Sequence, residues 1–239
     1  MKKPLESLTT NIRGTEIIFE KAHKYNKRTL VTSTSEIYGK NTSDSLSEED
    51  DRILGSPLKS RWSYSEAKAI DEIFAYTYWL EKKLETIIVR LFNTVGPRQT
   101  GNYGMVLPRF VDQALNGKPI TIFGDGKQTR CFCAVGDVTD GIIALSNEKR
   151  AFGKVFNLGG NEEISIGDLA KLIIEITASS STIEFIPYEI AYEEGFEDMQ
   201  RRVPDTRRAN ELVGFTQKIT LEEVIQMVIE EQLQTKGKF

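Results

Sequence analysis

The stretch Thr86–Asn93 reads TIIVRLFN, a nearly continuous apolar run that is brought to an end by Gly96 and Pro97. A strand with one face in water alternates apolar and polar residues, whereas a strand covered on both faces is apolar almost throughout. The run is therefore typical of a buried strand in a parallel sheet that carries helices on both sides.

Helix and strand patterns alternate on both sides of this run. Apolar residues recur at helical spacing in residues 5–25, and LVTSTS at residues 30–35 is a short strand that ends in hydroxyl side chains. Further helices are predicted over residues 61–83, 107–116, 137–145, from 165 onward and after Thr220, and further strands over residues 119–123, 129–134, 155–158 and 183–186. Asp137, Ser165 with Asp168, and Thr220 with Glu223 are predicted to cap their helices.

This alternation predicts an α/β fold with a parallel sheet, helices on both of its faces, and a small C-terminal α/β lobe. We place the boundary after residue 158. Residues 1–158 are then mainly the sheet domain, interleaved with segments of the lobe, and residues 159–239 are mostly the lobe.

The composition excludes several classes of protein. The chain has 239 residues and a net charge of −4, so it has no basic excess with which to bind nucleic acid. The sequence has no apolar run long enough to span a membrane and no apolar signal segment near its start, so we expect a cytoplasmic protein. One histidine, His23, and two cysteines, Cys131 and Cys133, supply a metal site poorly, and no metal is predicted.

Tyr64 and Lys68 form a Tyr-x-x-x-Lys pair on the predicted helix 61–83. Residues four apart share a helix face, and an ammonium beside a phenol favours the phenolate, which can accept a proton. Tyr78 and Lys82 have the same spacing but lie in an aromatic stripe, so we expect packing there. The first pair follows a strand that ends in hydroxyls, and ligands bind at the carboxyl ends of such strands.

Five segments together resemble the extended short-chain dehydrogenase/reductase family, and in particular its nucleotide-sugar epimerases, dehydratases and decarboxylases. These segments are TSTSEIYG (32–39), YSEAK (64–68), RLFNTVGPR (90–98), GDGKQTRCFCAVGD (124–137) and RRVPD (201–205). The resemblance covers almost the whole chain. It implies a Rossmann-type fold, NAD as the cofactor and a nucleotide-sugar substrate, in the first place a UDP-sugar.

The resemblance also implies roles for single residues. Tyr64 would be the acid/base, Lys68 would hold the nicotinamide ribose and lower the pKa of Tyr64, Thr34 would relay the proton, and Ser33 would lie on the cofactor side. The residues implied in substrate binding are Asn93, Arg98, Arg130, Arg202 and Asp205, the arginines because a guanidinium suits a diphosphate.

Ser35 and Glu36 bear on the choice of reaction. The 4,6-dehydratases have Thr-Asp-Glu where this chain has Thr-Ser-Glu, so dehydration is disfavoured. Thr-Ser-Glu resembles the UDP-glucuronate decarboxylases, but those carry an arginine where Met105 stands. The 4-epimerases usually have small residues at both positions, from which Glu36 departs. We expect an epimerase-type reaction at the sugar C4, with UDP-glucuronate decarboxylation as the alternative.

The sequence holds no Gly-x-x-Gly-x-x-Gly, with which the family binds the cofactor pyrophosphate. We therefore expect a truncated Rossmann-type sheet in which the strand 30–35 is an exposed edge that can associate with another chain. A third possibility is a catalytically inactive remnant or subunit that binds a nucleotide-sugar. The family resemblance implies a homodimer through the helices 5–25 and 61–83, whose apolar residues Ile12, Phe19, Ile73 and Phe74 could face either a partner or the sheet.

Overall fold

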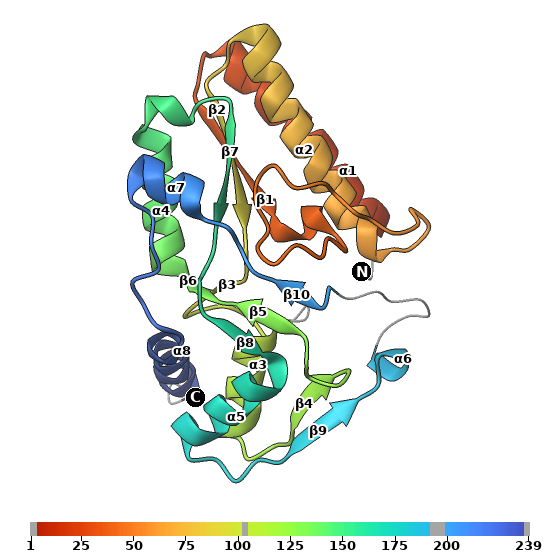
Figure 1. Ribbon diagram of the computed structural model, residues 1–239, viewed down its shortest axis with the longest axis vertical. Helices are drawn as coiled ribbons and strands as arrows, with labels where there is room; N and C mark the ends of the chain where they lie inside the picture. Colours follow the sequence, from red (N-terminus) through yellow and green to blue (C-terminus); the bar gives the residue numbers. More distant parts are fainter. Residues whose placement is uncertain (1–3, 102–104, 192–198, 237–239) are drawn as a thin grey trace.

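A computed structural model describes residues 4–101, 105–191 and 199–236 of the chain. Its upper part in Figure 1 is a parallel sheet of β1 (Thr29–Thr34), β2 (Thr86–Leu91) and β7 (Lys154–Leu158), in the order β1-β2-β7. The stretch that predicts a central buried strand is β2, which lies between its two neighbours with almost all of its residues buried.

Two helices that run parallel to each other, α1 (Pro4–Lys24) and α2 (Arg61–Lys82), lie side by side on one face of this sheet (Figure 1). Phe19 of α1 and Ala75 of α2 are fully buried and pack with Ile88 of β2. This cluster fixes α2, which carries Tyr64 in its first turn, along the face of β1 and β2.

The opposite face is covered by α4 (Val135–Asn147) and α7 (Arg207–Val213) (Figure 1). Ile87 and Val89 of β2 point into this second cluster together with Leu145 of α4 and Ala209 of α7. Because alternate residues of one strand are buried on opposite faces, β2 must be apolar on both, as its sequence is.

The lower part of Figure 1 is an α/β lobe built around a core of its own. Its strands form three small sheets: β3 (Thr94–Val95) with β6 (Cys133–Ala134); β5 (Thr129–Cys131) between β10 (Arg201–Arg202) and β8 (Glu163–Ser165); and β4 (Ile120–Phe123) with β9 (Ile183–Ile186). Its helices are α3 (Val106–Leu115), α5 (Ile166–Thr177), α6 (Tyr188–Ala191) and α8 (Leu221–Lys236). Two short 3-10 helices complete the described elements, η1 (Ser35–Tyr38) and η2 (Lys149–Ala151).

The predicted elements are found within a few residues of their expected ends, with one exception. The strand expected over residues 129–134 is divided at Phe132 into β5 and β6, which pair with different strands. The caps by Ser165 and Thr220 are confirmed, since each hydroxyl accepts from the main-chain nitrogen three residues later.

The predicted cap by Asp137 is wrong. The residue before α4 is Ala134, and Asp137 lies inside the first turn, where it is buried. Its carboxylate accepts from the main-chain nitrogens of Lys218 and Ile219, at 2.9 and 3.0 Å. It therefore joins α4 to the segment before α8, a long-range contact that sequence spacing does not reveal.

Both parts draw on both halves of the chain. The core of the lobe contains Val95 and Leu107 as well as residues of α5 and α8, and α7 returns to pack on the large sheet. The boundary after residue 158 stays a prediction, and the interleaving that was expected with it is pronounced.

Strand β1 pairs only with β2 among the described residues, so it is an edge of the sheet. The expected edge strand is thus observed, and its residues are mostly half-exposed. Within the described ranges, no helix is both long and apolar enough to cross a bilayer.

Candidate active site

The hydroxyl-rich end of β1 turns directly into η1. Thr34 caps this 3-10 helix, and its Oγ1 accepts from the main-chain nitrogen of Glu36 at 3.2 Å. Gly39 then adopts a φ of +61° that allows the chain to turn away. Thr34, Ser35 and Glu36 are therefore held on one rigid turn at the carboxyl end of the sheet.

The first two helical turns of α2 are attached to η1. The buried Ser65 donates its hydroxyl to the main-chain oxygen of Glu36 at 2.9 Å, and Nη2 of Arg61 lies 3.7 Å from the Glu36 carboxylate. The half-buried Tyr64, adjacent to Ser65, is thereby brought beside η1. Burial raises the pKa of the Tyr64 phenol, and the carboxylates of Glu36 and Asp71 raise it further.

Lys68 is held by a carboxylate in this structure. Its ammonium is 2.8 Å from Oδ2 of Asp71, and the two side chains are only 11% and 1% exposed. The pKa of Tyr64 is raised, mainly by burial and further by the carboxylates of Glu36 and Asp71, so the lowering expected from Lys68 is not seen here, and the role of Lys68 stays a prediction.

Arg202 reaches the same turn from β10. Its Nη1 lies 3.5 Å from the hydroxyl oxygen of Ser35 and 3.7 Å from the carboxylate of Glu36. Glu36 thus lies between Arg61 and Arg202. The structure therefore brings Thr34, Ser35 and Glu36 together with Tyr64 and Arg202, from three parts of the chain that are distant in sequence.

Two other predicted residues present buried polar atoms that have no hydrogen-bond partner among the described residues: the hydroxyl oxygen of Ser33 and the side-chain oxygen of Asn93. They stand near the carboxyl ends of β1 and β2, where the main-chain oxygen of Asn93 accepts from Cys133. Unpaired buried polar groups are costly, so a ligand that bonds to them would be favoured.

The remaining predicted residues are less directly connected to this turn. Arg130 is buried and donates to the main-chain oxygens of Thr129 and Gln200, so it helps to join β5 to β10. Arg98 has a left-handed φ of +68°. Asp205 accepts four hydrogen bonds from Arg207, whose guanidinium holds the pKa of that carboxyl below its usual range.

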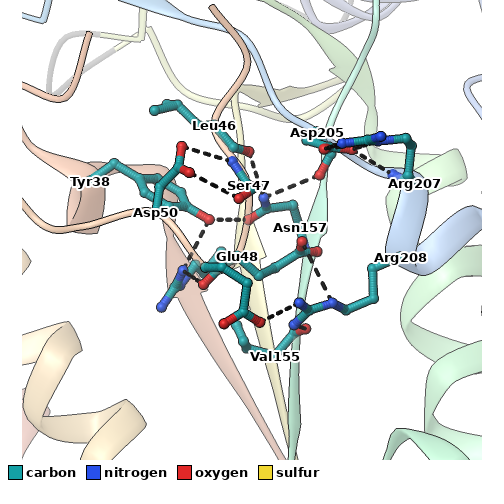
Figure 2. Close-up of polar contacts among 12 residues, drawn as sticks. Tyr38, Leu46, Ser47, Glu48, Asp50, Val155, Asn157, Asp205, Arg207 and Arg208 are labelled. Atoms are coloured by element: carbon teal, nitrogen blue, oxygen red, sulfur yellow. Dashed lines mark hydrogen bonds and ion pairs between the residues drawn. The ribbon is translucent and has the colours of Figure 1, made fainter. Parts of the chain in front are cut away.

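A buried polar network fixes the segment that carries Arg202 and Asp205 (Figure 2). The side chain of Asn157, at the end of β7, donates to the main-chain oxygens of Leu46 and Asp205 and accepts from the Tyr38 hydroxyl at 2.7 Å. Leu46 in turn exchanges main-chain hydrogen bonds with Val203 and Asp205. Asn157 therefore ties the RRVPD segment to the large sheet.

Two charged side chains complete this network. Arg90 of β2 donates to the Tyr38 hydroxyl at 3.0 Å and forms a two-pronged ion pair with Glu72 of α2. Glu48 accepts from the main-chain nitrogen of Asn157 at 2.7 Å and faces Arg208, as Figure 2 shows. Burial raises the pKa of Tyr38 to about 12, so this phenol stays protonated and donates.

Close packing also places the RRVPD segment. A Cβ at Gly159 would lie 2.7 Å from Phe92 and 2.9 Å from Pro204. Only a glycine lets the chain after β7 pass so near to both.

The sequence analysis missed Tyr38, Asn157, Ser65 and Asp71. Tyr38 lies inside a quoted family segment, and its position next to Gly39 could have drawn attention to it. Asn157 is a polar residue within an apolar strand and Asp71 a charge on the inner face of a helix, which are signals of a buried partner. The second Tyr-x-x-x-Lys pair behaves as expected, since Tyr78 stacks on Phe19.

A profile of the NAD dependent epimerase/dehydratase family matches residues 1–159. A UDP-N-acetyl-alpha-D-glucosaminuronate decarboxylase of Bacillus cytotoxicus is 40% identical over 231 residues, and UDP-glucuronic acid decarboxylase 1 of Danio rerio is 35% identical over 232. Each match covers 96% of this chain, which spans 71% of the first protein and 53% of the second. The chain belongs to the NAD dependent epimerase/dehydratase family.

Solved structures agree with this assignment. UDP-glucose 4-epimerase of Thermotoga maritima, crystallised with UDP-glucose, superposes with a TM-score of 0.87 at 28% identity over 98% of this chain and 73% of its own. UDP-glucuronic acid 4-epimerase of Bacillus cereus, in complex with UDP-glucuronic acid and NAD, gives 0.85 at 27% identity over 95% of this chain and 68% of its own. The fold is that of the family's Rossmann-type enzymes.

One end of NAD can be assigned to residues of this chain. The family resemblance implies that Tyr64 and Lys68 would hold the nicotinamide ribose and that Ser33 would lie on the cofactor side. The buried hydroxyl oxygen of Ser33, which has no hydrogen-bond partner among the described residues, fits such a contact. The sequence offers no glycine-rich turn for the pyrophosphate, so we assign no residue to that part of the cofactor.

The buried network makes a direct prediction for stability. Tyr38→Phe removes the hydroxyl that joins Asn157 to Arg90, so it should lower the free energy of unfolding by about 1–2 kcal/mol, as measured by urea denaturation. Tyr25→Phe, at an exposed position, is the matched control and should change the free energy little. An equal effect of both variants would contradict the role given to the network.

Proposed function

We propose that this chain carries the catalytic dyad and the sugar-binding side of an NAD-dependent enzyme that oxidises C4 of a UDP-linked sugar. The observation that carries the proposal is the attachment of α2 to η1 by Ser65 and Glu36, which sets Tyr64 beside the hydroxyl-rich end of β1. Family membership and the UDP-sugars for which the relatives are named support it.

In this proposal, Tyr64 accepts the proton of the sugar C4 hydroxyl, with Thr34 bonded to the same hydroxyl as the proton relay. NAD, when bound, supplies the hydride acceptor. Lys68 orients the ribose, and the unpaired oxygen of Asn93 receives a hydrogen bond from the substrate.

The product depends on what the sugar carries at C5. A 4-keto sugar with a carboxylate at C6 is a β-keto acid. Its C5–C6 bond can break with loss of CO₂, and the electron pair left on C5 is then protonated.

Arg202, close to Ser35 and Glu36, is the cation best placed to hold that carboxylate, since Met105 supplies none.

We therefore favour decarboxylation of a UDP-uronate as the overall reaction, a preference that the names of the Bacillus cytotoxicus and Danio rerio relatives support. Epimerisation at C4, the reaction expected first from the sequence, shares the same oxidation and is the second candidate. The epimerases among the similar structures support it.

Turnover distinguishes these reactions. The chain is incubated with NAD and either UDP-glucuronate or UDP-glucose, and the products are separated by mass and by chromatography. Tyr64→Phe should lower turnover of the accepted sugar at least about 100-fold, because the proton acceptor is lost. The control Tyr78→Phe changes the second Tyr-x-x-x-Lys pair and should keep turnover near that of the parent. Full activity in Tyr64→Phe would contradict the proposal.

Binding gives a test that does not need turnover. Arg202→Met should weaken UDP-glucuronate at least about tenfold in calorimetry, because a charge-assisted pair contributes about 1.5–3 kcal/mol, and should affect UDP-glucose less. Arg150→Met, at an exposed position of η2, is the control. Equal losses for both sugars would argue for a diphosphate contact instead. Binding that depends on Arg202 without any turnover would favour the inactive sugar-nucleotide-binding subunit.

We also propose that the chain forms a homodimer through α1 and α2. Ile73, Tyr76 and Leu80 are exposed along α2, and Ile17 and Ile18 along α1, whereas Phe19 is fully buried against the sheet. Sedimentation velocity should give a dimer that Ile73→Glu dissociates. A dimer that is unaffected by this change would favour association across the β1 edge.

The cytoplasmic location of the chain stays a prediction.

A further inference from the structure

A buried ion pair in α2 is left unexplained by the proposed reaction. The carboxylate of Asp71 is 1% exposed and holds the Lys68 ammonium with Oδ2 at 2.8 Å. Its other oxygen, Oδ1, is buried without a hydrogen-bond partner among the described residues. Such an incompletely bonded pair stabilises a fold poorly, because the cost of removing both charges from water is scarcely recovered.

The pair lies on the same side of α2 as the proposed acid/base. Tyr64, Lys68 and Asp71 are four and three residues apart, so they follow one another along one helix face. An ammonium favours ionisation of a neighbouring phenol only while its charge is not offset. Here the nearest charge to Lys68 is the Asp71 carboxylate.

Other charged groups around this face do not replace the missing positive charge. Glu36 on η1 is negative and lies between Arg61 of α2 and Arg202 of β10. Arg90 of β2 is bound to Glu72 through two hydrogen bonds. Strand β1, which also packs against α2, carries no charged residue.

We propose that Asp71 is a positioning residue that holds the Lys68 ammonium and so keeps the Tyr64 phenol protonated until Lys68 is drawn to another partner. Ionisation of the phenol then releases its proton to solvent. This inference rests on the proposed function only in taking Tyr64 as the acid/base. The pKa of Tyr64 is raised mainly by burial, and the direct charge effects of Glu36 and Asp71 add to it.

The ionisation of Tyr64 can be followed in the chain alone. Tyrosine labelled with ¹³C at Cζ is titrated by NMR, and Tyr64→Phe identifies the signal of Tyr64. In Asp71→Asn the midpoint should fall by about one pH unit or more, a tenfold larger phenolate fraction at a fixed pH below the midpoint. Near-UV circular dichroism checks that each variant is folded, and Asp71→Ser replaces Asp71→Asn should the amide prevent folding.

Two controls separate positioning from a general charge effect. Glu66→Gln removes another carboxylate of α2, one that pairs with Arg52, and should leave the midpoint unchanged. In a Lys68→Met background, Asp71→Asn should shift the midpoint less, because only the direct charge of Asp71 on the phenol is then removed and no ammonium remains to be released. An unchanged midpoint in Asp71→Asn, or an equal shift with and without Lys68, would overturn the inference. The titration needs neither NAD nor sugar, so its outcome is independent of whether the proposed reaction occurs.

Discussion

The hydrogen bonds of Asn157 are the constraint on which the site depends. This one side chain, at the carboxyl end of β7, joins the Tyr38 hydroxyl to the main chain of Leu46 and Asp205 (Figure 2). It thereby connects the large sheet, the loop after η1 and the RRVPD segment in a buried environment. Every member of such a network must be bonded, because an unpaired polar group there costs more than one bond contributes.

This network determines where the proposed site residues lie relative to one another. Arg202 comes from the RRVPD segment, Tyr64 from α2, and Thr34 to Glu36 from the end of β1 and η1. The buried network and the Ser65–Glu36 hydrogen bond hold these elements together. The side chains that hold the fold together are distinct from those proposed to contact the ligand. Buried, fully bonded side chains fix the geometry, while Ser33 and Asn93 keep polar atoms unpaired. A rigid frame with unpaired groups at its edge is suited to binding a ligand with little rearrangement.

Much of this arrangement could be predicted from local sequence. The continuous apolar run of β2 predicts its central position, and the helical spacing in α1 predicts its buried Phe19. Tyr64 also lies on a helix attached to the turn that carries Thr34 and Glu36, and the roles that the family resemblance implies for them stay predictions. Contacts between residues far apart in the sequence could not be predicted. Examples are the contact of Asn157 with Leu46, 111 residues apart, and that of Asp137 with Lys218. Asp71 shows a second limit, since a spacing rule names Lys68 as a partner of Tyr64 but does not reveal which charge holds it.

Tyr64 and Arg202 are proposed to act on one bound sugar. A crystal structure of the chain with UDP-glucuronate tests this proposal most directly. We expect the C4 hydroxyl within hydrogen-bond distance of the Tyr64 phenol and the C6 carboxylate on the Arg202 guanidinium, in contact with Ser35. A sugar whose carboxylate lies away from Arg202, or whose C4 hydroxyl does not reach Tyr64, would contradict the account.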